Sequence, residues 1–186
     1  MNPLLHLFCC AVILSSGPAG PSPKAVSHTV KKAVKELKSD GWKAISDQMT
    51  IDDQISEQFS RQLIEENGMP RFIMCTSTAS ADDFVTARKL AMTMAKSDIA
   101  SQFESEISSI CDAVLETSTL SDNESKLINS VVDAARVSVT RDLTSIDTVV
   151  ELFRVSPSNG FEVRITLAYD TEELKSELKH IQSLSE

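Results

Sequence analysis

The sequence predicts an α+β fold: a small, mainly antiparallel sheet with helices packed on one face, preceded by two N-terminal helices. Three observations lead to this fold class. Segments 146–155 and 161–169 flank a short loop ending in Asn-Gly, and the second alternates apolar and polar residues, which is typical of an antiparallel hairpin with one solvated face. Residues 71–80 are β-branched, aromatic and alternating, as in a strand. The segments that precede and separate these strands repeat apolar residues every three or four positions, which indicates helices.

The first twenty residues predict an export signal. They contain no charged side chain, and the apolar run from Leu4 to Leu14 is shorter than the roughly 20 residues that a membrane-spanning helix needs. Ala19 and Gly17 are small residues at the positions that signal peptidase requires. We therefore expect a signal peptide over residues 1–19 that is cleaved, with no transmembrane helix after its removal.

Two adjacent cysteines lie inside this apolar run. Lipid attachment would need a small residue just before the modified cysteine and a full apolar core upstream of it. Cys9 follows Phe8, and Cys10 follows Cys9, with fewer than ten residues in front of either. We therefore interpret both as ordinary residues of the apolar core, and lipid attachment at Cys9 or Cys10 as the less favoured alternative.

The remaining chain predicts one domain. Residues 20–26 are rich in proline and glycine and are expected to form a flexible tether, followed by a single α+β domain over residues 27–186. Its helices are expected, in order, over residues 24–38, 51–63, 80–104, 121–139 and 170–181. Residues 106–117 fit either the end of the third helix or a new strand, and we favour the strand.

The third of these helices has an unusual face. Ala87, Ala91 and Ala95 form a ridge with almost no side chain, which would let the helix axis come close to a sheet. Asp98 falls in the same stripe, where a buried carboxylate would cost several kcal/mol unless it were hydrogen-bonded. We expect Asp98 to bond a neighbouring backbone or to reach solvent at the edge of the helix.

The composition argues against several classes of function. A formal net charge of -9 would repel nucleic acid, and an aromatic content of 5% leaves few rings for stacking. The sequence has no glycine-rich phosphate loop, no G-x-S-x-G motif and no zinc or EF-hand spacing. Adjacent acidic pairs fall at predicted helix starts, where the helix dipole favours them. We therefore expect no enzyme activity, no catalytic or metal-binding residues, no cofactor and no nucleic-acid partner.

Two cysteines remain after the expected signal cleavage. Cys75 and Cys111 both fall in segments that we expect to be strands. In an oxidising compartment they could form a disulfide, while buried thiols inside strands are an equally good interpretation. Both alternatives stay open.

The central block of the sequence resembles a known family. The run FIMCTSTASADDFVTARKLAMTMAKSDIASQF repeats A-x-x-x-A and is followed by the hairpin VVELFRVSPSNGFEVRITLAY. Together, over about residues 70–170, these resemble the small outer-membrane lipoprotein family of Gram-negative envelopes, of about twenty kilodaltons, and more distantly the N-terminal domain of flagellar assembly protein T. The resemblance implies a compact envelope domain without known catalytic residues. Many members are anchored through a cysteine at the end of the signal, whereas this sequence has its early cysteines inside the apolar core.

These observations favour a non-enzymatic, exported protein of the cell envelope, periplasmic or associated with the outer membrane. It would act as a structural or protein-interaction module for an envelope partner. The candidate contact surfaces are the polar face of the hairpin, with Glu162 and Arg164, and the two N-terminal helices. The alternative is a domain that binds a small ligand or lipid in a pocket between the sheet and the N-terminal helices, lined by Phe59, Leu63, Phe72 and Met74.

Overall fold

The computed structural model of the chain describes residues 23–66, 69–115, 122–137, 146–156, 159–172, 174–176 and 180. The expected signal peptide, with Cys9 and Cys10, lies outside the described residues. Helix α1 (Pro23–Ser39) begins inside the stretch 20–26 that we expected to be a tether.

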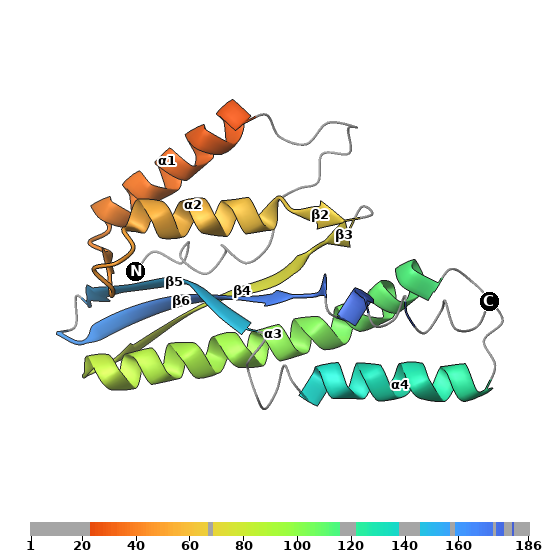
Figure 1. The fold of residues 1–186 in the computed structure, drawn as a ribbon. Coiled ribbons are helices and arrows are strands. Elements are labelled where there is room, and N and C mark those ends of the chain that lie inside the picture. Colours follow the sequence, from red (N-terminus) through yellow and green to blue (C-terminus); the bar gives the residue numbers. More distant parts are fainter. Residues whose placement is uncertain are drawn as a thin grey trace.

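A four-stranded antiparallel sheet forms the centre of the fold (Figure 1), which confirms the α+β class. Its strands are β1 (Lys43–Ala44), β5 (Ile146–Val155), β6 (Phe161–Asp170) and β4 (Phe72–Ala81), in that spatial order. The predicted hairpin is β5 and β6, and the predicted third strand is β4. Two short strands, β2 (Glu65–Glu66) and β3 (Met69–Pro70), pair only with each other.

Helices lie on both faces of this sheet, not on one as the sequence led us to expect (Figure 1). Helices α1 and α2 (Ile51–Gln62) lie on one side, and α3 (Phe84–Leu115) and α4 (Asp122–Val137) lie on the other. Thr166 and Ala168 of β6 were expected to face water, yet each is only 1% exposed. Their small side chains permit this cover, because the Thr166 hydroxyl is hydrogen-bonded to that of Thr76 at 2.7 Å and Ala168 has no polar side-chain atom to satisfy.

The core on the α3 side contains the predicted alanine ridge. Ala87, Ala91 and Ala95 are fully buried, and they pack with Val163, Ile165 and Leu167 of β6 in one apolar cluster. Residues of this size let the helix axis approach the strands closely. The α2 side has its own cluster, in which Trp42, Ile55 and Leu152 are buried.

Both ends of α3 differ from the sequence-based expectation. The helix begins at Phe84, and the Asp83 carboxylate accepts a hydrogen bond from the Thr86 backbone amide at 2.9 Å, so Asp83 is the cap and Ser80 belongs to β4. The helix continues to Leu115, so the strand that we favoured over residues 106–117 is wrong. No glycine or proline occurs between Phe84 and Leu115 to end the helix earlier.

Candidate functional site

Strand β4 lies at one end of the sheet and pairs on one side only. All ten of its residues are in continuous register with β6, from Phe72 opposite Asp170 to Ala81 opposite Phe161. On the other side, the backbone from Thr76 to Ala81 makes no hydrogen bond to any described residue. We call residues Thr76–Ala81 the open edge.

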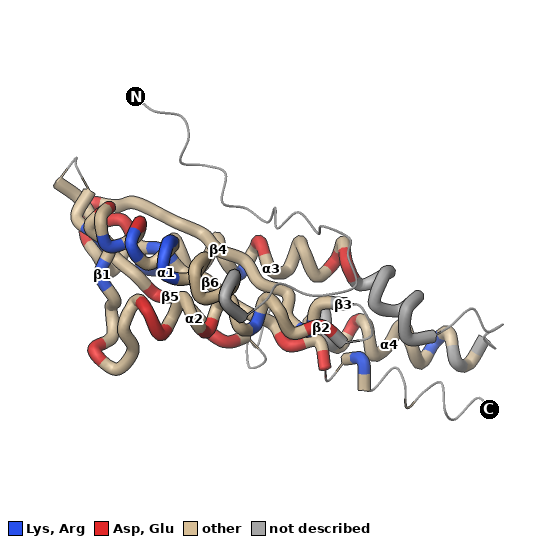
Figure 2. Tube along the Cα trace, turned by 90° about the horizontal axis from the view of Figure 1, so that it is seen from above, with Lys and Arg blue, Asp and Glu red and all other residues tan. Residues whose placement is uncertain are grey.

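Within the part of the chain that the structure describes, the open edge lacks the sequence features that normally protect an edge strand. Natural edges are blunted by charged residues, proline, bulges or short length, because unpaired N–H and C=O groups invite another strand to pair with them. The open edge contains no charged residue (Figure 2). It also contains no proline, and its pairing with β6 has no bulge. At the opposite end of the sheet, β1 is only two residues long.

Side chains of the open edge alternate between the two faces of the sheet. Ser77, Ala79 and Ala81 face α3, since the Ser77 hydroxyl donates to Asp98 and the two alanines pack in or against the α3-side cluster. Thr78 and Ser80, on the α2 side, are exposed. A strand added here would therefore meet two chemically different surfaces.

One row of α3 residues runs along the open edge. Asp98 accepts the Ser77 hydroxyl at 2.6 Å, and Gln102, one turn later, accepts the Cys75 thiol at 3.0 Å. Leu90 and Met94 continue the same row by four-residue steps, which places them beside Ala81 and Ala79. They are 45% and 47% exposed. We call Leu90, Met94, Asp98 and Gln102 the edge ridge; the first two residues form an apolar surface next to the open edge.

Asp98 reaches solvent at the edge of the helix, which is one of the two placements that we expected for it. It lies at the edge of α3, it is exposed, and it accepts a hydrogen bond from Ser77 instead of sitting unpaired in the core.

The hairpin residues that we nominated, Glu162 and Arg164, do not form an open polar surface together. Glu162 is held in an ion pair with Arg154 at 2.5 Å, and both side chains are less than 20% exposed. The Arg154 guanidinium also lies 4.7 Å from the centre of the Trp42 ring. This pair therefore fixes β5 and β6 to the segment after α1.

Arg164 is placed differently. It stands one strand in from the open edge, directly opposite Thr78 on one side and Leu152 on the other. It makes no hydrogen bond or ion pair with any described residue. Partial burial lowers the pKa of its guanidinium, which still remains charged at neutral pH. The positive charge of Arg164 therefore has no carboxylate partner among the described residues.

Of the two cysteines that we expected in strands, only one lies in a strand. Cys75 is in β4, as expected, and its thiol donates to Gln102. Cys111 belongs to helix α3 and not to a strand, and its side chain lies outside the described part. Whether Cys75 and Cys111 form a disulfide stays open.

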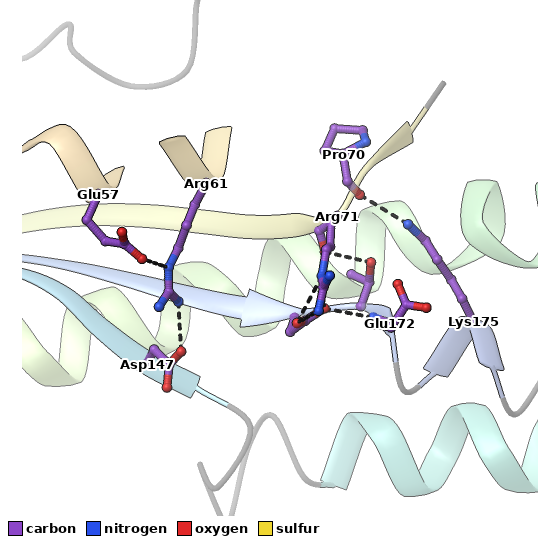
Figure 3. A network of polar contacts seen from close by, with 9 residues as sticks. Glu57, Arg61, Pro70, Arg71, Asp147, Glu172 and Lys175 are labelled. Atoms are coloured by element: carbon purple, nitrogen blue, oxygen red, sulfur yellow. Dashed lines mark hydrogen bonds and ion pairs between the residues drawn. The ribbon is translucent and has the colours of Figure 1, made fainter. Parts of the chain in front are cut away.

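The residues of the alternative pocket lie largely in packed structure. Met74 is buried in the α2-side cluster, and Phe59 and Phe72 pack against that cluster. The Arg61 guanidinium lies 5.1 Å from the centre of the Phe72 ring, while Leu63 is exposed. Figure 3 shows that Arg61 also bridges Glu57 of α2 and Asp147 of β5.

A second surface feature is a shallow groove of about 430 Å³ along the first half of α3. Its lining comes from α3 alone: Phe84, Val85, Arg88, Lys89, Met92, Thr93 and Lys96. Arg88 is engaged by Glu151 of β5 at 2.6 Å. The groove faces away from the open edge, because Arg88 points to β5 and the edge ridge points to β4.

Several other charged side chains cap helices or join one helix to the next. Asp53 and Asp83 take part in the capping of α2 and α3, as their positions at helix starts predicted. Lysines concentrate on α1 and acidic residues on α2, which adjoin (Figure 2), and Lys38 pairs with Asp52 across them. No group of three or more His, Cys, Asp or Glu side chains suited to a metal ion occurs within the described ranges.

Comparison with family models, curated proteins and solved structures finds no match to this chain. The resemblance to the small outer-membrane lipoprotein family therefore stays an expectation. Among the described residues, no helix combines the length and apolar character needed to cross a bilayer.

Sequence reasoning missed the edge ridge. Leu90 and Met94 are apolar residues that flank the alanine ridge in the sequence, and both are exposed. The signal that was available is the absence of charge from Phe72 to Ala81, and it gains meaning only once β4 is known to lie at the end of the sheet.

Proposed function

We propose that this chain is a non-enzymatic, exported protein of the cell envelope, periplasmic or associated with the outer membrane, that acts as a protein-interaction module. It binds an extended segment of an envelope partner, which adds to the sheet as a strand along the open edge. Strand addition of this kind draws affinity from backbone hydrogen bonds and specificity from the side chains on either face.

The observation that carries this proposal is the combination of an unprotected edge with apolar side chains beside it. Over six residues without an obstructing charge, the outer backbone groups of the open edge have no partner among the described residues. Leu90 and Met94 present apolar surface at the same place, where an added strand would cover them. Backbone pairing and apolar burial would thus act together on a single bound segment.

The same observations favour an interaction module over the pocket alternative. Phe72 and Met74 pack with the core between α2 and the sheet, so their apolar surface is already used. Leu90 and Met94, by contrast, are exposed, so their apolar surface is still available to a partner.

Edge substitutions test the docking site. Thr78→Lys places a charge on the open edge, and Met94→Lys places one on the edge ridge. The matched controls are Val155→Lys at the end of β5, where the side chain is 66% exposed, and Leu127→Lys on α4, where it is 46% exposed. Envelope extract is passed over each immobilised variant, and the bound proteins are quantified by mass spectrometry.

We expect at least one envelope protein to bind wild type and both controls, and to fall about tenfold or more in both edge variants, equivalent to about 1.4 kcal/mol. Thermal unfolding of all four variants checks that the fold is kept. A set of bound proteins that responds equally to edge and control substitutions would rule out docking at the open edge.

The mass of the native protein from fractionated cells tests export. Cleavage after Ala19 predicts an envelope product that begins at Gly20 and carries no acyl chains, because the apolar run that holds Cys9 and Cys10 is removed. The same measurement reports whether Cys75 and Cys111 are oxidised. Acyl mass on Cys9 or Cys10 would contradict cleavage at this site, and recovery of the full-length chain in the cytoplasm would contradict export.

A further inference from the structure

On each face of the sheet, one charged side chain lies beside the open edge without an ion-pair partner among the described residues, whereas Glu162, opposite Ser80, is paired with Arg154. Asp98 lies on the α3 face beside Ser77, to which it is hydrogen-bonded at 2.6 Å. Arg164 lies on the α2 face directly opposite Thr78 and has no charged partner among the described residues. Neither charge belongs to β4 itself, so both remain available to a strand that pairs with β4.

The positions of these charges fix which residues of an added strand they would meet. Strands are spaced by about 4.8 Å, so the Arg164 side chain is long enough to reach past Thr78 toward the next strand. A residue opposite Thr78 would share its face with Arg164. The neighbouring residue, opposite Ser77, would point to the other face, toward Asp98.

The edge ridge specifies two more positions. Met94 lies beside Ala79 and Leu90 beside Ala81, and both alanines are too small to cover these side chains. Residues opposite Ala79 and Ala81 would project onto the α3 face and contact Met94 and Leu90. Apolar side chains at those two positions would bury the exposed ridge surface.

We infer that the partner segment runs antiparallel to β4 and carries a five-residue pattern that the open edge recognises. From its N-terminal side, this pattern has an apolar residue opposite Ala81, any residue opposite Ser80 and a second apolar residue opposite Ala79. An acidic residue opposite Thr78 and a basic residue opposite Ser77 complete it. This inference rests on the proposed function and names the chemistry of its partner. The antiparallel direction follows from the sheet, in which all neighbouring strands are antiparallel.

Charge complementarity separates such a partner from a second copy of this chain. A copy that paired through its own β4 would bring an uncharged strand, leaving Arg164 without a counter-ion and supplying no cation for Asp98. Each copy also carries a net charge of -9, which opposes association. A foreign segment with an acidic and a basic residue in adjacent positions meets both requirements.

Two synthetic peptides of equal composition test the charge order. Each is a ten-residue, end-capped peptide with the central sequence Val-Thr-Val-Glu-Lys in the first and Val-Thr-Val-Lys-Glu in the second, flanked by threonines. Binding to the mature, isotope-labelled protein is followed by the shifts of backbone amide resonances. We expect the first peptide to bind about tenfold more tightly, because its Glu lies on the face of Arg164 and its Lys on the face of Asp98, whereas the second peptide places like charges together. The shifted amides should concentrate at Thr76–Ala81.

Variants that remove one charge each provide the matched control. Asp98→Asn keeps the side-chain shape and its acceptor for Ser77, and Arg164→Gln keeps a polar side chain at the same place. Each should reduce the preference for the first peptide to about threefold, and the two together should abolish it. The intrinsic fluorescence of Trp42, the sole tryptophan, checks that each variant is folded.

The outcomes separate this inference from the proposed function. Equal binding of both peptides, lost in Thr78→Lys, would overturn the charge order while strand addition at the open edge stands. Failure of both peptides to bind, together with unchanged partner capture by the edge variants, would overturn both. A dimer in sedimentation that Thr78→Lys dissociates would show a second copy as the occupant and overturn the inference.

Discussion

At the residue scale, the ion pair between Arg71 and Asp170 closes the end of the sheet opposite to Ala81. The Arg71 guanidinium contacts both Asp170 carboxylate oxygens, with a shortest distance of 2.7 Å. Figure 3 shows this contact beside the bond from the buried Lys175 ammonium to the Pro70 carbonyl. These bonds tie the residues just before β4 to the end of β6 and to the residues that follow it.

The surroundings of Asp170 predict how stability depends on pH. Burial alone would raise the pKa of its carboxyl group, but hydrogen bonds from Arg71 and from the Glu172 amide, with the charges of Arg71 and Lys175, hold that pKa below 3.8. Because the folded-state pKa is depressed, the stabilisation is fully present well above pH 3.8. It is lost as pH falls from there through the lower folded-state pKa.

We therefore expect the wild type to be more stable than Asp170→Asn at neutral pH, with a difference that shrinks below about pH 4. Urea unfolding of both proteins at a series of pH values measures this difference. A difference that is independent of pH would show that the Asp170 charge does not contribute. Thr148, which is exposed on β5, provides a neutral surface control as Thr148→Asn.

At the element scale, the alanine ridge makes α3 sensitive to added volume. Ala91 has no exposed surface and packs in the cluster that includes β6. Ala91→Leu would have to push the helix away from the sheet, so we expect a loss of about 1–3 kcal/mol in the free energy of unfolding. Thr93→Leu adds bulk on the exposed side of the same helix and should change stability by less than about 0.5 kcal/mol.

Chemical denaturation of these two variants measures the contrast. A loss of less than about 0.5 kcal/mol in Ala91→Leu would mean that the helix tolerates added volume on its buried face, and the close approach of α3 to the sheet would then not matter for stability.

Elements were predictable where a long periodic pattern marked them. Strands β5 and β6 were placed to within one residue, and β4 was displaced by one, because alternation over ten residues is a strong signal. Strands β1, β2 and β3 were missed, since two residues cannot display a period. The end of α3 was misjudged because apolar residues in 106–117 fit both a strand and a helix.

At the scale of the whole molecule, the candidate site depends on strand order, which no local pattern contains. The neutral composition of β4 is visible in the sequence, but the same ten residues would be unremarkable in a central strand. Glu162 and Arg164 were chosen from alternation within one hairpin. The pairing of Glu162 with Arg154 and the position of Arg164 behind the open edge emerge only from the assembled sheet.

The two-residue length of β1 has a consequence for assembly size. A molecule with two long open strands can join others head to tail into a growing filament. Among the described residues, the sheet has at one end a six-residue edge with no partner strand on its outer side, and at the other end a strand of only two residues. A partner added at β4 would therefore end the series, and the complex should have one partner segment per chain.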